Sequence, residues 1–282
     1  MMAAIEQAFR KAGALGTGLA RRFGAAWAVL MLSIVFASGS VFACGIAQAA
    51  AALPVAPSPM MAEDENLPDW LRRLFDPSYR SQSGKPEHVI IGLDLSKSNP
   101  LVDDPDFALK VATYVRNELT ALPARSKVTL RTFGVDSAQA NRLGRDRIVT
   151  NADSATDAAQ FFYTIIRNVP TLVQRGTIEA QNYTNIISFL NNASQVISCS
   201  AFDTRVILAT DGIEDSEFTK LRDATARLPA PPSGQFQGCG ELLMLGIGQG
   251  QNSPTTTARL RREWLRWSRT AGFETFRGLN NW

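Results

Sequence analysis

Histidine and cysteine are scarce in this 282-residue chain, which has one histidine and three cysteines. Zinc centres take several ligands from these residue types, so the count argues against a zinc site built from them. His88 lies early in an apolar run, and the sequence has no Gly-x-Ser-x-Gly turn to present a serine nucleophile. Because no pairing of a nucleophile with a base is visible, we expect that the chain is not an enzyme.

The net charge is also small, at +3 over the whole chain. Residues 1–60 hold four basic side chains and one acidic side chain, which leaves 25 of each sign in the rest of the chain. A globular part with no excess of basic residues is not typical of nucleic-acid-binding proteins. We therefore expect no nucleic-acid partner.

The amino-terminal segment has the pattern of an export signal. Arg21 and Arg22 precede an apolar run over 25–37, and the small residues Ala47 and Ala49 follow. This order predicts a signal peptide over 1–49. An uncleaved membrane anchor is an alternative, and a lipoprotein cleaved before Cys44 is another. We expect an exported protein that is periplasmic or anchored to the outer face of the inner membrane. A lipoprotein or a secreted protein is a less favoured alternative.

A proline-rich tether over 50–85 follows, with a short amphipathic helix predicted around Trp70, Leu71, Leu74 and Phe75. Beyond it, apolar runs with strand character alternate with stretches of helical period. The predicted strands cover about 88–94, 127–133, 147–149, 205–210, 241–247 and 273–277. The predicted helices cover about 105–122, 154–168, 185–198, 216–228 and 254–271. This alternation predicts an α/β fold, a doubly wound and mostly parallel central sheet flanked by helices.

Small oxygen-bearing side chains follow two of these strands. Asp94, Ser96 and Ser98 alternate directly after the first strand, and Asp211 follows the strand 205–210. Thr184 stands just before the helical pattern 185–198. In open α/β sheets ligands bind beyond the carboxyl ends of the strands, and such oxygen ligands suit a hard divalent cation.

The order Asp-x-Ser-x-Ser, a single Thr and then Thr-Asp-Gly resembles the metal-ion-dependent adhesion site (MIDAS) of von Willebrand factor A (vWA) domains. The resemblance covers about residues 86–278 and implies a Rossmann-like vWA domain over 86–282. It implies that Ser96, Ser98 and Thr184 offer hydroxyls to Mg²⁺, or to Mn²⁺ or Ca²⁺. Asp94 and Asp211 would bind the ion directly or through water. An Asp or Glu from a partner protein would complete the coordination shell.

The resemblance also implies a disulfide between Cys199 and Cys239. In the family's sheet the strands that follow these cysteines are neighbours, which would place both at the edge opposite the metal. Two unrelated buried thiols are the alternative.

Two functions stay open at this point. The first is cation-dependent protein binding, in adhesion or in the assembly of an envelope complex. The second is a structural subunit of a cell-envelope, secretion or conjugation assembly, in which the metal only stabilises the loops.

Overall fold

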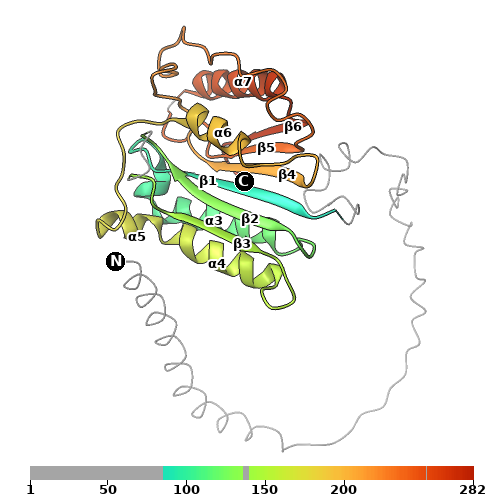
Figure 1. Ribbon diagram of the computed structural model, residues 1–282. Coiled ribbons are helices and arrows are strands. Elements are labelled where there is room, and N and C mark those ends of the chain that lie inside the picture. The colour runs from blue at the N-terminus through green and yellow to red at the C-terminus, as the bar shows by residue number, and fades with distance from the viewer. Residues whose placement is uncertain (1–84, 136–139, 252) are drawn as a thin grey trace, which may run out of the picture. The chain divides into compact units, whose positions relative to one another are not determined.

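A six-stranded sheet with helices on both faces forms the body of the protein in the computed structural model, which describes residues 85–135, 140–251 and 253–282 (Figure 1). These residues belong to one compact unit, Glu63–Trp282. The predicted signal peptide, tether and short helix lie outside the described residues. No helix in the described part of the chain is long and apolar enough to cross a membrane.

The sheet has the strand order β3-β2-β1-β4-β5-β6. Its strands are β1 (Glu87–Asp94), β2 (Lys127–Phe133), β3 (Gly144–Ile148), β4 (Asp203–Ala209), β5 (Glu241–Leu245) and β6 (Thr275–Leu279). β3 runs antiparallel to β2, and the other neighbouring pairs are parallel. The predicted α/β class is confirmed, with a mixed and mostly parallel sheet. The chain order reverses between β1 and β4, so the loops after these strands diverge there.

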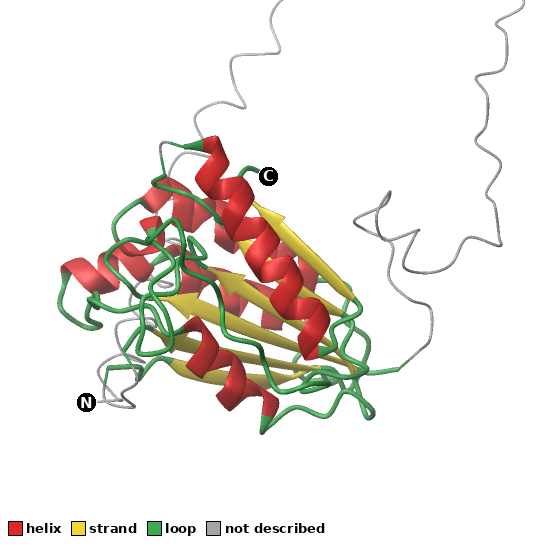
Figure 2. Ribbon diagram, turned by 90° about the horizontal axis from the view of Figure 1, so that it is seen from above, coloured by secondary structure: helices red, strands yellow, loops and turns green. Residues whose placement is uncertain are grey.

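Helices cover the two faces of the sheet as separate layers (Figures 1 and 2). The bounds are α3 (Pro105–Leu119), α4 (Ala155–Arg167), α5 (Val169–Gln174), α6 (Ile186–Ser194) and α7 (Pro254–Ala271), with a 3₁₀ turn η1 (Pro100–Val102). α3 and α4 pack on one face in a core with Ile91, Leu130 and Leu243. α6 and α7 pack on the other face with Val206 and Leu242. Alternate residues of each strand therefore serve opposite cores, as a sheet buried on both faces requires.

Two predicted elements differ from the structure. α5 occupies part of the predicted loop 170–183, where Pro170 is accommodated in the first turn of the helix. The predicted helix 216–228 does not form, and this stretch consists of turns and bridges.

Side chains of α7 bind part of the backbone of residues 221–228 instead. The Arg259 guanidinium donates to the carbonyls of Leu221 and Ala226, and Arg266 donates to that of Leu228. Glu263 accepts from the Leu228 N–H at 3.3 Å. These contacts replace hydrogen bonds that a helix would form. The helical spacing of apolar residues over 216–228 was therefore not sufficient to predict the conformation of this segment.

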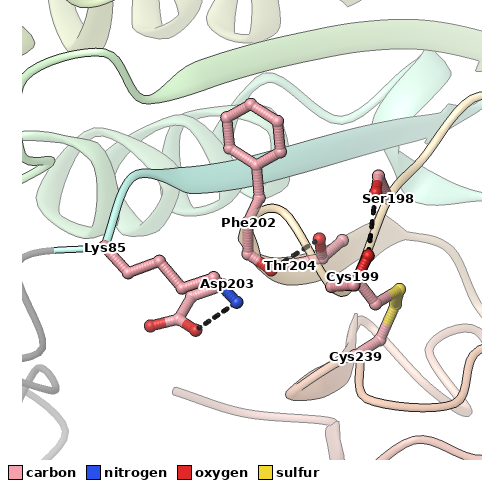
Figure 3. The surroundings of a disulfide bond; sticks show 8 residues. Lys85, Ser198, Cys199, Phe202, Asp203, Thr204 and Cys239 are labelled. Carbon is pink, nitrogen blue, oxygen red and sulfur yellow. Dashed lines mark hydrogen bonds and ion pairs between the residues drawn. A yellow bond between two sulfur atoms is a disulfide. The ribbon is translucent and has the colours of Figure 1, made fainter.

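The Cys199–Cys239 disulfide is present, so the predicted pairing is confirmed (Figure 3). Its Cα atoms are 4.8 Å apart, and the two cysteines precede the neighbouring strands β4 and β5. They lie at the amino ends of these strands, whereas Asp94 and Asp211 lie at or beyond carboxyl ends. The disulfide and the predicted metal site are therefore at opposite edges of the sheet.

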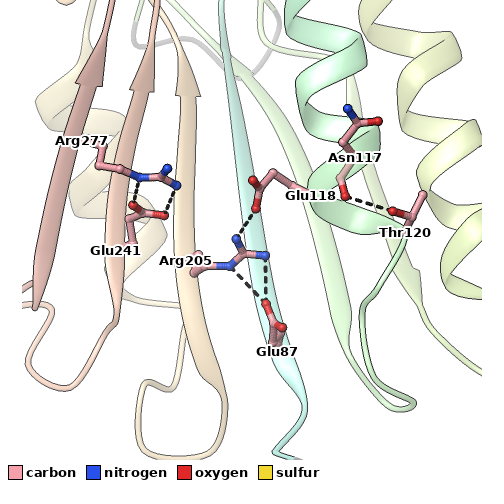
Figure 4. A network of polar contacts seen from close by, with 7 residues as sticks. All are labelled: Glu87, Asn117, Glu118, Thr120, Arg205, Glu241 and Arg277. Atoms are coloured by element: carbon pink, nitrogen blue, oxygen red, sulfur yellow. Dashed lines mark hydrogen bonds and ion pairs between the residues drawn. The ribbon is translucent and has the colours of Figure 1, made fainter. Parts of the chain in front are cut away.

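Partly buried charged side chains form ion pairs near the amino ends of the strands (Figure 4). Arg205 of β4 donates to Glu87 of β1 at 3.1 Å and to Glu118 of α3 at 2.6 Å. Arg277 of β6 binds both carboxylate oxygens of Glu241 on β5. Each guanidinium is therefore paired with at least one carboxylate.

Candidate functional site at the carboxyl edge of the sheet

Asp94 ends β1, and its side chain lies completely buried against the next turn. One carboxylate oxygen, Oδ1, accepts from the backbone N–H of Ser96 at 2.8 Å. The other, Oδ2, accepts from the Thr210 hydroxyl at 2.8 Å. The Ser96 and Ser98 hydroxyls are 3.3 Å apart. The turn therefore gathers the first three predicted ligands, Asp94, Ser96 and Ser98.

Asp211 follows β4 and is likewise completely buried. Its Oδ1 atom accepts from the backbone N–H of Ile213 at 2.9 Å. Its Oδ2 atom is buried and has no hydrogen-bond partner among the described residues. A buried carboxylate oxygen without a donor is costly, and such atoms commonly mark the place of a water or an ion.

Thr184 reaches the same edge through its backbone. It pairs with Asp215 in an antiparallel bridge, with N–H···O distances of 3.2 and 3.0 Å. Thr184 is 2% exposed, and α6 begins two residues later. The structure thus joins Asp94, Ser96, Ser98 and Asp211 by direct electrostatic or hydrogen-bond contacts, and it adds Thr184 through the segment that follows Asp211. We call these five residues the carboxyl-edge cluster.

Buried polar side chains that the sequence analysis missed hold the turns in place. The Asn99 amide donates to the carbonyls of Asp94 and Ala209, at 2.9 and 3.0 Å. Gln181 pairs with the Ser96 turn through its backbone, while its side-chain oxygen accepts from Val135 N–H. Nothing in the local pattern distinguished these residues from ordinary turn residues, since their partners are distant in sequence.

Glu214 is a further buried acid beside the cluster that the sequence analysis did not single out. Its Oε2 atom accepts from the N–H groups of Ile186 and Ile187, at 2.8 and 3.2 Å, at the start of α6. Its Oε1 atom accepts from the Ser216 hydroxyl at 2.5 Å. Glu214 therefore links the segment after Asp211 to the helix after Thr184. Burial raises the pKa of this carboxyl to about 7.

The two aspartates of the cluster destabilise each other as anions. Burial, together with repulsion from Asp211, raises the pKa of Asp94 to about 7. Burial also raises the pKa of Asp211, while the hydrogen bond from Ile213 N–H and the nearby Ser98 hydroxyl partly oppose the rise. Two close buried carboxylates favour a bound proton or a cation between them. The arrangement can therefore accept positive charge.

The residues present fit a small oxygen-binding cation. Mg²⁺ is typically held by one or two carboxylates and keeps several waters, so it does not need a cage of acids. Asp211 Oδ2 is available for a ligand, and the hydroxyls of Ser96 and Ser98 lie in the same turn. Both oxygens of Asp94 already accept hydrogen bonds. A cation bound here would find Asp211 Oδ2 free to act as a carboxylate ligand, and Asp94 would chiefly contribute charge balance.

Comparisons with known proteins show no family for this chain. No family model matches it, and no curated protein matches it. Solved structures with similar folds include a D319A mutant of the PilB minor pilin from Streptococcus sanguinis, at 12% identity and a TM-score of 0.41. The similarity covers 71% of this chain and 58% of that one.

Two further structures give comparable values. The pilus adhesin SpaC from Lactobacillus rhamnosus GG is 13% identical with a TM-score of 0.40, over 71% of this chain and 29% of that one. Proximal thread matrix protein 1 from the mussel byssus is 14% identical with a TM-score of 0.40, over 70% and 44% of the two chains. This chain spans less than two thirds of the length of each of the three structures, and these values carry no argument about its function.

The assignment to vWA domains with a complete adhesion site is therefore wrong. No family model matches the chain. Among the described residues, no group of three or more His, Cys, Asp or Glu is placed to hold a metal. The physical reason is that a short order of Asp, Ser and Thr after strands specifies polar turns, not a family. Any cation site here rests on this chain's own geometry.

Proposed function

We propose that the carboxyl-edge cluster binds a divalent cation and, through it, a carboxylate of a partner protein. The observation that carries the proposal is Asp211 Oδ2, a completely buried carboxylate oxygen without a partner among the described residues. A cation would both satisfy this atom and relieve the repulsion between Asp211 and Asp94. Mg²⁺ is the first candidate, with Mn²⁺ and Ca²⁺ as alternatives.

The chemistry of the ligand set suggests how a partner would be engaged. Two carboxylates neutralise a divalent charge, and the neutral hydroxyls of Ser96, Ser98 and Thr184 donate little further electron density. A cation held in this way keeps an affinity for another anionic oxygen. An Asp or Glu of the partner would supply it, as Mg²⁺ commonly takes part of its shell from a second molecule.

The same proposal includes the cellular setting and the absence of catalysis. A disulfide such as Cys199–Cys239 persists in oxidising compartments, which supports export. The pattern of residues 1–49 supports the same conclusion. We expect a periplasmic or membrane-anchored binding protein in adhesion or envelope assembly, and not an enzyme.

Calorimetric titration of Mg²⁺ and Mn²⁺ into the full-length chain tests this function. The wild type should bind one ion, and Asp211→Asn should lose that binding while remaining folded. Asp146→Asn is the matched control. It also neutralises an aspartate, but Asp146 of β3 forms an exposed ion pair with Arg131 of β2. Equal binding by wild type and Asp211→Asn would refute the proposal.

A structural role for the ion is the second candidate. It is favoured by the complete burial of Asp94 and Asp211, which limits direct access by a partner. In that case, removal of the ion with EDTA should lower the melting temperature strongly and leave assembly contacts unchanged. The protein-binding role instead predicts a loss of partner contacts at temperatures where the fold is intact.

A further inference from the structure

We infer that Asn99 is a positioning residue of the carboxyl-edge cluster, and that its buried amide sets the cation affinity by holding the Asp94 turn against the Asp211 turn. The inference rests on the proposed function. Asn99 is 1% exposed, so it acts through the two turns and not by touching a partner.

The pairing of β1 with β4 does not extend to the two aspartates. β1 and β4 pair as parallel strands up to Leu93 and Ala209. Asp94 lies one residue beyond this last pair and is held in the sheet by its pairing with Phe133 of β2, whereas Asp211 lies two residues beyond the pair. The separation of the Asp94 turn from the Asp211 turn therefore also depends on contacts outside the β1–β4 ladder.

Asn99 supplies such contacts from a single group. Its Nδ2 atom donates to the carbonyl oxygens of Asp94 and Ala209, which belong to different strands. Asp94 is 5 positions from Asn99 along the chain, whereas Ala209 is 110 positions away. Its Oδ1 atom accepts from the Leu101 N–H at 3.3 Å, which fixes the orientation of the amide. The side chain thus joins the ends of β1 and β4 where the ladder stops.

The hydrogen bonds of the Asn99 amide oppose the electrostatic repulsion between the two aspartates of the cluster. Repulsion between the buried carboxylates of Asp94 and Asp211 favours separation of the two turns when no cation is bound. The neutral Asn99 amide adds donors without adding charge. If the Asp94 and Asp211 turns already have the right spacing, they need not rearrange when the cation binds. Loss of the Asn99 amide should therefore weaken cation binding.

The substitution Asn99→Ser separates two roles of the side chain: the contact between the ends of β1 and β4, and the cap of the η1 turn. A serine hydroxyl can still cap the η1 turn by accepting from Leu101 N–H, as Asn99 does. It is too short to reach the carbonyls of both strands. Asn99→Thr makes the same change while filling more of the volume of the lost amide, and it serves if Asn99→Ser does not fold.

The test is a Mn²⁺ titration of the full-length wild type, Asn99→Ser and Asn99→Thr, by calorimetry at a temperature where each is folded. The matched control is Asn168→Ser, since the Asn168 amide donates to Thr164 O at 2.7 Å at the end of α4. Electron paramagnetic resonance of the bound Mn²⁺ supplies a signature of ligand geometry that a loss of stability alone does not alter.

The Asn99 variants should bind Mn²⁺ at least about tenfold more weakly, with an altered resonance spectrum, while Asn168→Ser keeps the wild-type constant and spectrum. Wild-type affinity and spectrum in a folded Asn99 variant would overturn the inference alone. If the wild type binds no Mn²⁺, or binds it as well as Asp211→Asn does, the proposed function falls and the inference falls with it.

Discussion

At the scale of single residues, burial changes the chemistry of the one histidine. His88 is 3% exposed, and its Nε2 atom lies 3.1 Å from the Thr129 hydroxyl. Burial, helped by the charge of Lys127 and opposed by Asp146, lowers its pKa to about 4. The folded protein therefore keeps His88 neutral at pH values where the unfolded chain protonates it.

This shift gives His88 a defined pH dependence. Between pH 6.5 and about 4 the unfolded state binds more protons at this position than the folded state does. Its contribution to stability is therefore complete above pH 6.5 and is lost as the pH falls towards 4. At pH 5 the loss should be about 2 kcal/mol.

Urea unfolding of wild type and His88→Gln at pH 7.5 and pH 5 measures this contribution. The wild type should lose more stability than the variant between the two pH values, and the difference isolates His88 from the buried acids, which titrate in the opposite sense. An equal loss in both proteins would contradict the predicted depression of the His88 pKa.

The residues of the cluster were predictable to different degrees. Asp94, Ser96 and Ser98 follow a strongly apolar strand at alternate positions, and Asp211 follows another, so strand ends and alternation were sufficient to find them. Asn99 and Gln181 were not found, because their function depends on partners that only the folded sheet brings near. In sequence, polar turn residues such as Asn99 and Gln181 look the same whether or not they form hydrogen bonds to distant segments.

At the scale of elements, the strands and the longer helices were predictable because their apolar residues keep one period throughout. α7 was predicted over about 254–271, and it has these bounds. Three of its arginines, Arg259, Arg261 and Arg266, bind backbone carbonyls of other segments. The sequence does not reveal such long-range contacts.

Glu263 should be important for the segment held against α7. It is 2% exposed and accepts from Arg227, Arg266 and the Leu228 N–H. Glu263→Ala leaves these donors without their acceptor, so stability should fall by about 2 kcal/mol. Urea denaturation checks this value. Arg262→Ala, which truncates an exposed side chain on the same helix, should change stability little. Equal stability of the two variants would argue against this role of Glu263.

Glu214 should stabilise the start of α6. Glu214→Ala removes the acceptor for Ile186 and Ile187 N–H, and the loss of a helix cap predicts destabilisation by about 1–2 kcal/mol. Glu214→Gln keeps an acceptor for these groups and a donor for Ser216, so it should lose less. Thermal and urea unfolding of the pair provides the comparison. A greater loss in Glu214→Gln than in Glu214→Ala would contradict the capping role.

At the scale of the whole molecule, the two edges of the sheet have different tasks. The amino edge carries the disulfide and the matched charges of Arg205 with Glu87 and Glu118. The carboxyl edge carries the buried acids Asp94 and Asp211, and Asp211 keeps an oxygen without a partner in the described part of the chain. A covalent bond and ion pairs thus stabilise the amino edge, whereas the carboxyl edge holds two buried carboxylates that can accept positive charge.

Removal of the disulfide should therefore affect stability and leave cation binding intact. The bond closes a loop with a sequence separation of 40, and the chain-entropy model gives about 4 kcal/mol for such a loop. The double variant Cys199→Ser/Cys239→Ser should lose up to this amount by urea unfolding. Its Mn²⁺ affinity should match the wild type at temperatures where both are folded. A large loss of affinity would show that the two edges are coupled.

The most direct test of the cation site is an anomalous difference map from crystals of the protein grown with Mn²⁺. We expect a peak at the carboxyl edge, coordinated by Asp211 Oδ2 and by hydroxyls of the Ser96–Ser98 turn, and no such peak in crystals of Asp211→Asn. A wild-type map with no peak at this position, although Mn²⁺ is present at millimolar concentration, would refute cation binding by the carboxyl-edge cluster.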